Sequence, residues 1–414
     1  MRVDELQREL ARRIETAPGA GRDLDAVVRR GRRRLARRRF IGGVAAVLLL
    51  AAVATPIVLR ERSTNTVSAG PVPGTAHLGW AVHDKTRAGL GTGTLLHAVA
   101  NSGDSLLAAG ARPTGPARSW RPAIWYSNDG TNWKSAPVPL SPGEVVAIAA
   151  EGNRAIAVGT DGSGLSTFVW ASEDRGRHWA AIAEGTQIFG SPAPQMGRPF
   201  VTGLRAVGRT WVANGGSSDG YAAVWTSRDG TRWRQVLDSA ASRTAGSVDV
   251  TTAANGRLFG YWATTGWYSA RGRSWGAPIA LVVPDRLLLR TVAPRASVAF
   301  GESVDRGGLP TPLLRSDDDG RTWTVDRAFL DAAPGATVLT VTRTGGLWVA
   351  AGTSGSPNHP DAWVSTDLTR WHRLPESLYG GPGGTLGLVG VAGKRLVILG
   401  TAPELDRFYT LDAR

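Results

Sequence analysis

Short runs of apolar and small residues alternate with polar, glycine-rich turns over most of the chain, from about residue 76 to residue 414. One unit contains the runs VVAIAAEGN (145–153), AIAVG (155–159), TFVWAS (167–172) and, after a polar turn, HWAAIAE (178–184). Short strands at regular spacing with such turns indicate an antiparallel all-β meander. The pattern therefore predicts groups of four consecutive strands.

The polar turn before the fourth run occurs six times. Four copies agree well: SNDGTNW (127–133), SEDRGRHW (172–179), SRDGTRW (227–233) and SDDDGRTW (316–323). SARGRSW (269–275) has Arg271 where Asp is expected, and STDLTRW (365–371) keeps Asp367 but has Thr369 in place of glycine. The closing tryptophans recur every 42 to 54 residues, a period that signals repeated supersecondary units. Four strands per unit of about 45 residues is typical of a β-propeller blade.

Each residue type in the turn has a structural use. An Asp carboxylate accepts N–H groups of its own turn, Gly adopts positive φ, and Trp packs its large face between sheets. The candidate positions are Ser127, Asp129, Gly130, Trp133, Ser172, Asp174, Gly176, Trp179, Ser227, Asp229, Gly230, Trp233, Ser269, Gly272, Trp275, Ser316, Asp318, Gly320, Trp323, Ser365, Asp367 and Trp371.

These turns resemble Asp-boxes, also known as bacterial neuraminidase repeats, which occur in sialidases and in many propellers that are not sialidases. The resemblance covers about residues 76 to 414. It implies that each turn joins the third and fourth strands of a blade on the outer rim, away from any active site. A structural role is therefore expected for the turns themselves.

The remaining runs predict a seventh blade. After Trp371 come TLGLVGVAG, KRLVILG and RFYTLDA, which are three strands without a repeated turn. Before the first full unit, HLGWAVHD (77–84) is one strand. Pairing this strand with the last three closes the ring and removes exposed sheet edges. We therefore predict an all-β, seven-bladed β-propeller over residues 77–414.

The N-terminal 76 residues have a different pattern. Residues 29–39 contain eight arginines, and residues 40–59 form a run of twenty without a charge. Such a run is long enough to span a bilayer, and Arg-rich flanks stay in the cytoplasm. This predicts a cytoplasmic Arg-rich helical tail (1–39), a transmembrane helix or uncleaved signal anchor (40–59), a flexible stalk (60–76) and an extracytoplasmic propeller.

A second interpretation of this segment is export and release. ARRRFIG (36–42) resembles the twin-arginine export signal, and Ala52 to Ala54 form a candidate cleavage site. Val3, Leu6, Leu10 and Ile14 recur at helical spacing. Residues 1–28 therefore contact either a cytoplasmic regulator, such as a sigma factor, or the membrane surface.

The composition limits the kinds of functional site that the chain can contain. The chain lacks cysteine, which excludes disulfides, thiolate metal sites and cysteine nucleophiles. The net charge is +14, but residues 1–62 hold 15 of the 48 basic residues and only 7 of the 34 acids. Because this basic cluster adjoins the predicted span, it suits anionic lipid headgroups better than nucleic acid.

Candidate catalytic residues are few. Sialidases use three arginines, a Tyr–Glu pair and an Asp, and their Arg-Ile-Pro motif is missing here. The first strand of each predicted blade lines the channel with small residues, and the polar exceptions are His97, Arg205, Arg290 and Arg343. The six histidines lack ligand spacing, so we predict no metal site and no cofactor.

These patterns favour a membrane-anchored extracytoplasmic propeller that binds an envelope glycan or protein without catalysis and that signals inward through its tail. Two alternatives stay open: a sialidase-like exo-glycosidase, and a scaffold for the assembly of envelope proteins. The fold by itself does not choose among them.

Overall fold

The computed structural model describes residues 79–412, apart from residues 115–118, 140–142, 162–166, 185–188, 190–198, 218–221, 239–246, 254–255, 285–286, 294, 296, 304–311, 345, 356–358, 376–377 and 379–383. The predicted tail (1–39), span (40–59) and stalk (60–76) lie outside these residues. Within the described part of the chain, no helix is both long and apolar enough to cross a membrane. The chain divides into residues 1–61 and 62–414, and the fold described below belongs to the second unit.

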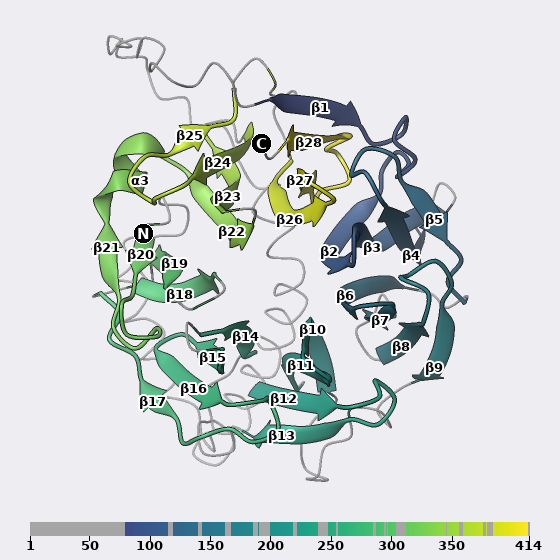
Figure 1. The fold of residues 1–414 in the computed structure, drawn as a ribbon, viewed down its shortest axis with the longest axis horizontal. Coiled ribbons are helices and arrows are strands. Elements are labelled where there is room, and N and C mark those ends of the chain that lie inside the picture. The colour runs from purple at the N-terminus through teal and green to yellow at the C-terminus, as the bar shows by residue number, and fades with distance from the viewer. Residues whose placement is uncertain are drawn as a thin grey trace, which may run out of the picture. The chain divides into compact units, whose positions relative to one another are not determined.

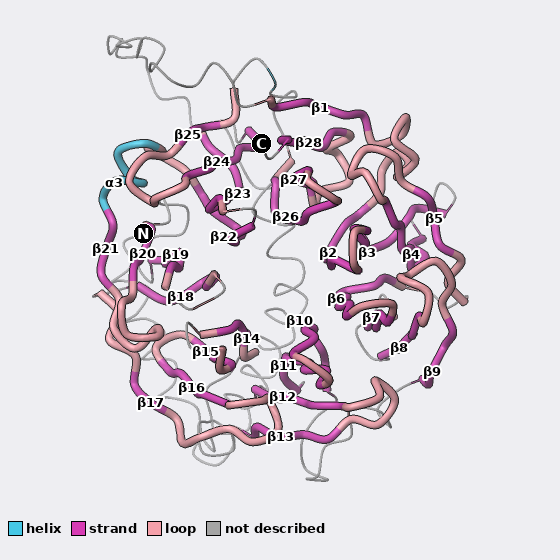
Figure 2. The backbone as a smooth tube through the Cα atoms, viewed as in Figure 1, coloured by secondary structure: helices cyan, strands magenta, loops and turns pink. Residues whose placement is uncertain are grey.

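Seven four-stranded antiparallel sheets are arranged in a ring, as Figures 1 and 2 show. Blade 1 comprises β2 (Leu95–Ser102), β3 (Ser105–Thr114), β4 (Ser119–Ser127) and β5 (Lys134–Ala136). Blade 2 comprises β6 (Glu144–Glu151), β7 (Arg154–Thr160), β8 (Thr167–Ser172) and β9 (Ala180–Glu184). Blade 3 comprises β10 (Pro199–Val207), β11 (Thr210–Ser217), β12 (Ala222–Ser227) and β13 (Arg234–Asp238). Blade 4 comprises β14 (Asp249–Thr252), β15 (Leu258–Trp262), β16 (Thr265–Ser269) and β17 (Ile279–Ala280).

The other three blades repeat this plan, with the first strand of each innermost (Figure 1). Blade 5 comprises β18 (Leu287–Val292), β19 (Val298–Ser303), β20 (Leu313–Arg315) and β21 (Thr324–Asp326). Blade 6 comprises β22 (Thr337–Thr344), β23 (Leu347–Ser354), β24 (His359–Ser365) and β25 (His372–Arg373). Blade 7 comprises β26 (Leu386–Ala392), β27 (Arg395–Gly400), β28 (Arg407–Asp412) and β1 (Trp80–Asp84). The predicted seven-bladed propeller is confirmed.

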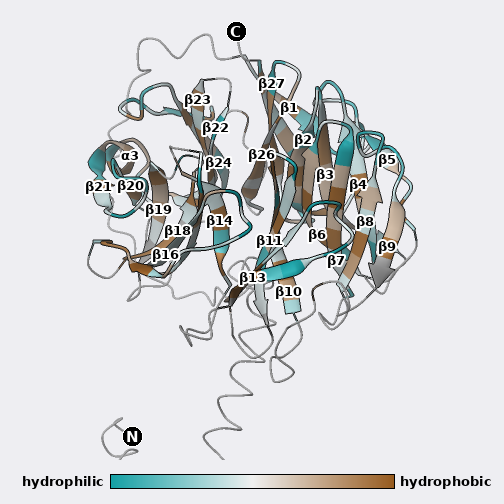
Figure 3. Ribbon diagram, turned by 60° about the horizontal axis from the view of Figure 1, so that its bottom comes forward, coloured by the Kyte–Doolittle hydropathy of each residue, from teal (hydrophilic) through white to brown (hydrophobic). Residues whose placement is uncertain are grey.

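The apolar core lies between the blades. Seven clusters of buried side chains each join residues of two neighbouring blades. Between blades 1 and 2, for example, Leu107 and Ile124 pack with Val145 and Trp170. The strands carry most of the apolar positions (brown in Figure 3). Burial of both faces of each blade explains why the runs are so rich in small and apolar residues.

Six of the seven inner strands carry a β-bulge in the same place. The extra residues are His97, Val146, Thr202, Arg290, Leu339 and Gly387. The residue before each bulge pairs with a glycine of the second strand: Gly110, Gly159, Gly215, Gly301, Gly352 and Gly400. A Cβ on Gly110 would lie 1.9 Å from the Leu95 carbonyl oxygen. Glycine is therefore needed here because two backbones approach closely.

The ring closes as predicted, by pairing the two ends of the described chain. β1 pairs antiparallel with β28, with Trp80 opposite Leu411 and Asp84 opposite Arg407. Lys85 follows β1, and its backbone N–H donates to the Asp406 carbonyl at 2.8 Å. The Lys85 side chain is fully buried, and its Nζ donates to the Gly400 carbonyl at 3.3 Å. Burial lowers the pKa of Lys85 to about 8, against the opposing negative charges of Asp406 and Glu404.

One helix is not anticipated by the strand pattern. α3 (Arg327–Ala332) follows β21, and its N-cap Asp326 accepts the Ala328 N–H at 2.8 Å. Phe329 of this helix is fully buried and makes edge contacts with Phe300 at 5.0 Å and Trp363 at 5.5 Å. The helix therefore fills the gap between blades 5 and 6 with one aromatic side chain. Six residues are too few to show helical periodicity in a sequence.

Candidate functional site

The six repeated turns each join the third and fourth strands of a blade, and we call them the repeat turns. In blade 3 the Ser227 hydroxyl accepts the Gly230 N–H at 2.8 Å. Asp229 Oδ1 accepts the N–H groups of Thr231 and Arg232, both at 2.9 Å. The same pattern recurs at Asp129, Asp174, Asp318 and Asp367. The carboxylates thus hold the turns together.

These hydrogen bonds keep the turn carboxylates ionised. Burial alone would raise the pKa of Asp229, but the N–H groups of Arg232 and Thr231 and the Ser227 hydroxyl outweigh it. Its pKa therefore lies well below the usual range. For Asp174, burial is likewise outweighed, by the N–H and ring of His178, and the pKa falls to about 2.

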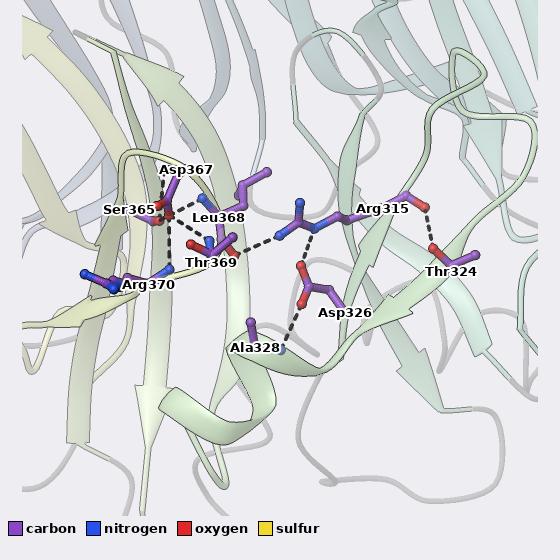
Figure 4. A network of polar contacts seen from close by, with 9 residues as sticks. All are labelled: Arg315, Thr324, Asp326, Ala328, Ser365, Asp367, Leu368, Thr369 and Arg370. Atoms are coloured by element: carbon purple, nitrogen blue, oxygen red, sulfur yellow. Dashed lines mark hydrogen bonds and ion pairs between the residues drawn. The ribbon is translucent and has the colours of Figure 1, made fainter.

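The structure corrects one reading of the blade 6 turn. The glycine position is occupied by Leu368, not by Thr369: Leu368 has φ 66°, and its N–H donates to Ser365 Oγ at 2.9 Å, as glycine does elsewhere. Thr369 instead donates its N–H to Asp367 at 2.8 Å (Figure 4). In blade 4, where Arg271 replaces Asp, Gly272 keeps φ 75° and its bond to Ser269.

Five of the six repeat turns accept a hydrogen bond from the preceding blade. Arg395 of blade 7 donates to the Asp129 carbonyl at 3.0 Å, and Arg154 of blade 2 donates to the Asp229 carbonyl at 2.8 Å. Arg315 of blade 5 donates to the Leu368 carbonyl at 2.9 Å and pairs with Asp326 (Figure 4). The turns therefore connect neighbouring blades. Their Asp, Gly and Trp positions have a structural explanation.

The three predicted channel residues with described side chains, His97, Arg205 and Arg343, each contact a different neighbour. His97 and Arg290 are bulge residues, whereas Arg205 and Arg343 lie nearer the ends of their strands. His97 Nε2 lies 2.8 Å from Glu144 Oε2 of blade 2, and each side chain is 17% exposed. The Arg343 guanidinium lies over the Trp348 ring at 5.3 Å. The side chain of Arg290 lies outside the described atoms.

Arg205 belongs to a polar cluster that crosses three blades. Its Nε donates to the Val250 carbonyl of blade 4. Burial raises the pKa of the neighbouring Asp249 to about 6, against the positive charge of Arg205. Opposite Asp249 on the next strand, Tyr261 accepts the Val292 N–H of blade 5 at 3.0 Å. The strand pattern gave no signal for Asp249 or Tyr261, because Arg205 and Val292, which act on them, belong to other blades.

An open pocket lies at the outer ends of blades 3 and 4. It encloses about 340 Å³ and is lined by Thr210, Thr226, Ser227, Arg228, Asp229, Arg232, Arg234 and Arg273. We call it the arginine pocket. All four arginines are exposed, whereas Thr210, Thr226 and Ser227 are buried. It lies on the rim rather than in the channel where the sequence placed its candidates.

Most of the guanidinium groups in this pocket are available. The Arg234 Nη2 donates to the Arg273 carbonyl at 3.0 Å. Within the described part of the chain, the guanidinium groups of Arg228, Arg232 and Arg273 make no hydrogen bond or ion pair. Asp229 is the single acid among the lining residues. The lining therefore has an excess of positive charge, which the described residues around it do not pair.

Among the described residues, no group of three or more His, Asp or Glu side chains is arranged to hold a metal ion. The acidic run Asp317–Asp319 serves its repeat turn, where the Asp318 carboxylate accepts the Thr322 N–H at 2.8 Å.

Solved structures with the same fold include the following two. YCF48 bound to D1 peptide is 13% identical, with a TM-score of 0.56 over 83% of this chain and 98% of that chain. A catalytically inactive virginiamycin B lyase from Staphylococcus aureus, solved with quinupristin, is 9% identical, with a TM-score of 0.53 over 81% of this chain and 99% of that chain. No family model and no curated protein matches the sequence. Identities this low show the fold alone: the chain is a seven-bladed β-propeller.

Proposed function

We propose that this protein is a membrane-anchored extracytoplasmic propeller that binds a protein or peptide and carries out no catalysis. The arginine pocket is the observation that carries this proposal. It presents uncompensated guanidinium groups on turns whose backbone is held by internal hydrogen bonds. A turn backbone that is already held in place reduces the part of the entropic cost of binding that comes from ordering loops.

Three further observations support binding. The polar channel residues His97 and Arg205 have partners in the next blade, so they hold blades together. YCF48, one of the solved propellers named above, was solved with a bound peptide. The uncharged run 40–59 with its Arg-rich flank supports a single-pass anchor with residues 1–39 inside the cell. Residues 1–28 would then contact a cytoplasmic regulator such as a sigma factor.

Site-specific photo-crosslinking in native membranes tests the binding role. Full-length protein with a photo-reactive residue in place of Thr231, on the blade 3 turn, should capture a discrete protein partner. The same residue in place of the exposed Ser135 of blade 1 serves as the matched control and should capture none. Deleting residues 1–28 in a parallel pull-down should release a cytoplasmic partner while the envelope partner stays.

The alternative is an exo-glycosidase. Turnover of a fluorogenic sialoside by the purified full-length protein, abolished by Asp249→Asn, would overturn the non-catalytic proposal. Equal capture at Thr231 and Ser135 would also count against it, because a specific partner contacts one surface.

A further inference from the structure

We propose that the arginine pocket binds a segment of a partner protein that carries several neighbouring Asp or Glu side chains. This inference rests on the proposed binding function and names its ligand. Three observations support it: the positive charge is concentrated on two neighbouring repeat turns, the guanidinium groups there are free to bind, and the backbone N–H groups of the blade 3 turn are already used.

The positive charge of this rim is local to one blade boundary. From its Ser to the residue after its Trp, the blade 3 turn (227–234) holds three arginines and one acid, and the blade 4 turn (269–276) holds two arginines and no acid. The blade 5 turn (316–324) holds three aspartates and one arginine. With histidine counted as neutral, the turns 127–134, 172–180 and 365–372 each have equal numbers of acids and bases. The two positive turns are neighbours in the ring.

The degenerate turn of blade 4 adds to this concentration. Arg271 stands where the other five turns have an aspartate that accepts two N–H groups. Gly272 still donates its N–H to Ser269 at 2.8 Å, so the turn is kept with its carboxylate exchanged for a guanidinium group. The substitution removes the carboxylate that accepts N–H groups in the other turns and adds a positive charge to the turn that carries Arg273 of the pocket. A binding role explains why that exchange is tolerated at this position.

Carboxylates fit the available donors better than a compact phosphate does. Phosphate sites commonly use backbone N–H groups gathered at a nest or a helix N-terminus. Here the N–H groups of Gly230, Thr231 and Arg232 already donate to Ser227 and Asp229. What is free is a set of separate guanidinium groups, each able to bind a carboxylate through two parallel hydrogen bonds.

The pocket size suits a peptide segment. A volume of about 340 Å³ holds a few side chains rather than a folded domain. Three arginines on two turns, unpaired among the described residues, can each bind one carboxylate. An extended acidic segment provides several carboxylates at a suitable spacing. Such attraction also speeds association and weakens as salt screens it.

The probe is a fluorescein-labelled hexaglutamate peptide with a benzophenone group, applied to purified full-length protein. Residues 29–39 carry eight arginines and will also attract this peptide. The site is therefore identified by mass spectrometry of the crosslinked fragments, and affinities are compared between variants that keep the same tail. We expect crosslinks to residues 222–238 and 265–280.

The test variant is Arg228→Glu/Arg232→Glu, and the matched control is Arg121→Glu/Arg407→Glu, which reverses two exposed arginines elsewhere on the propeller. We expect the pocket variant to lose these crosslinks and to bind the peptide at this site at least tenfold more weakly, with the control unchanged. Tenfold corresponds to about 1.4 kcal/mol. Both variants should melt like the wild type, since these side chains make no internal hydrogen bond.

Three outcomes overturn the inference. Equal losses in both variants would mean general attraction rather than a site. Displacement of the peptide by inorganic phosphate at equal charge concentration would mean an anion site of another class. If the native partner is captured at Thr231 equally by wild type and by the pocket variant, the acidic-segment inference fails while the proposed binding function stands.

Discussion

Replacing the buried Lys85 by methionine should make the folded protein more stable at neutral pH. The Lys85 side chain is 0% exposed, and its single hydrogen bond runs from Nζ to the Gly400 carbonyl at 3.3 Å. Methionine has a similar length and flexibility without a charge, so it can occupy the same space. The substitution thus removes the free-energy cost of burying an ammonium group, and it loses one hydrogen bond.

The magnitude follows from the pKa. Burial lowers the pKa of Lys85 from 10.5 to about 8, although Asp406 and Glu404 oppose the shift. A difference of this size costs the folded state about 3 kcal/mol below pH 8. Losing the bond to the Gly400 carbonyl costs about 1 kcal/mol. The net expectation for Lys85→Met at pH 7 is a gain of about 2 kcal/mol in the free energy of unfolding.

The stability difference between Lys85→Met and the wild type depends on pH. Between pH 8 and 10.5 the folded protein has released the Lys85 proton while the unfolded chain still holds it, so wild-type stability rises with pH. The advantage of Lys85→Met must therefore shrink across this window and become a deficit of about 1 kcal/mol above it, where only the lost hydrogen bond counts. An advantage that stayed constant with pH would indicate a packing effect.

Urea unfolding followed by tryptophan fluorescence at pH 7, 8.5 and 10 measures this difference. Lys394→Met is the matched control because Lys394 is exposed on the β26–β27 turn, and it should change stability by about 0.5 kcal/mol or less at every pH. The reasoning is refuted if Lys85→Met is less stable than wild type at pH 7.

Three further substitutions test the architecture by urea unfolding. Gly110→Ala should cost roughly 3 kcal/mol, because its Cβ would lie 1.9 Å from the Leu95 carbonyl oxygen, whereas Gly79→Ala, with open space around it, should be neutral; equal effects would contradict the bulge argument. Phe329→Ala should cost about 3–5 kcal/mol by emptying the space between blades 5 and 6, and a change below about 1 kcal/mol would show that α3 is peripheral. Asp174→Asn should cost roughly 1 kcal/mol above pH 4, since the 41% exposed carboxylate is screened. This difference should disappear as pH falls from 4 to 2, because the folded pKa of about 2 lies below the unfolded value. A difference that persists at pH 2 would assign the loss to geometry rather than charge.

The sequence by itself determined the blades and the closure of the ring. Each blade depends on local chemistry: short apolar runs form strands, and a Ser, an Asp and a Gly within one turn satisfy that turn's own N–H groups. The expected strands can be counted along the sequence in groups of four. The count leaves one run that ends at Asp84 and three runs after Trp371, and these four were predicted to form the seventh blade.

Tertiary structure alone decided where the charged groups meet. Lys85 becomes buried because the chain after β1 packs against β27 and β28, more than 300 residues away in sequence. Asp249 acquires its raised pKa from burial near Arg205 of another blade, and the arginine pocket forms because two positive turns are adjacent in the ring. A linear pattern reports which residues share a strand or a turn. It does not report which blades bring their side chains together, because that depends on the packing of whole sheets across each boundary.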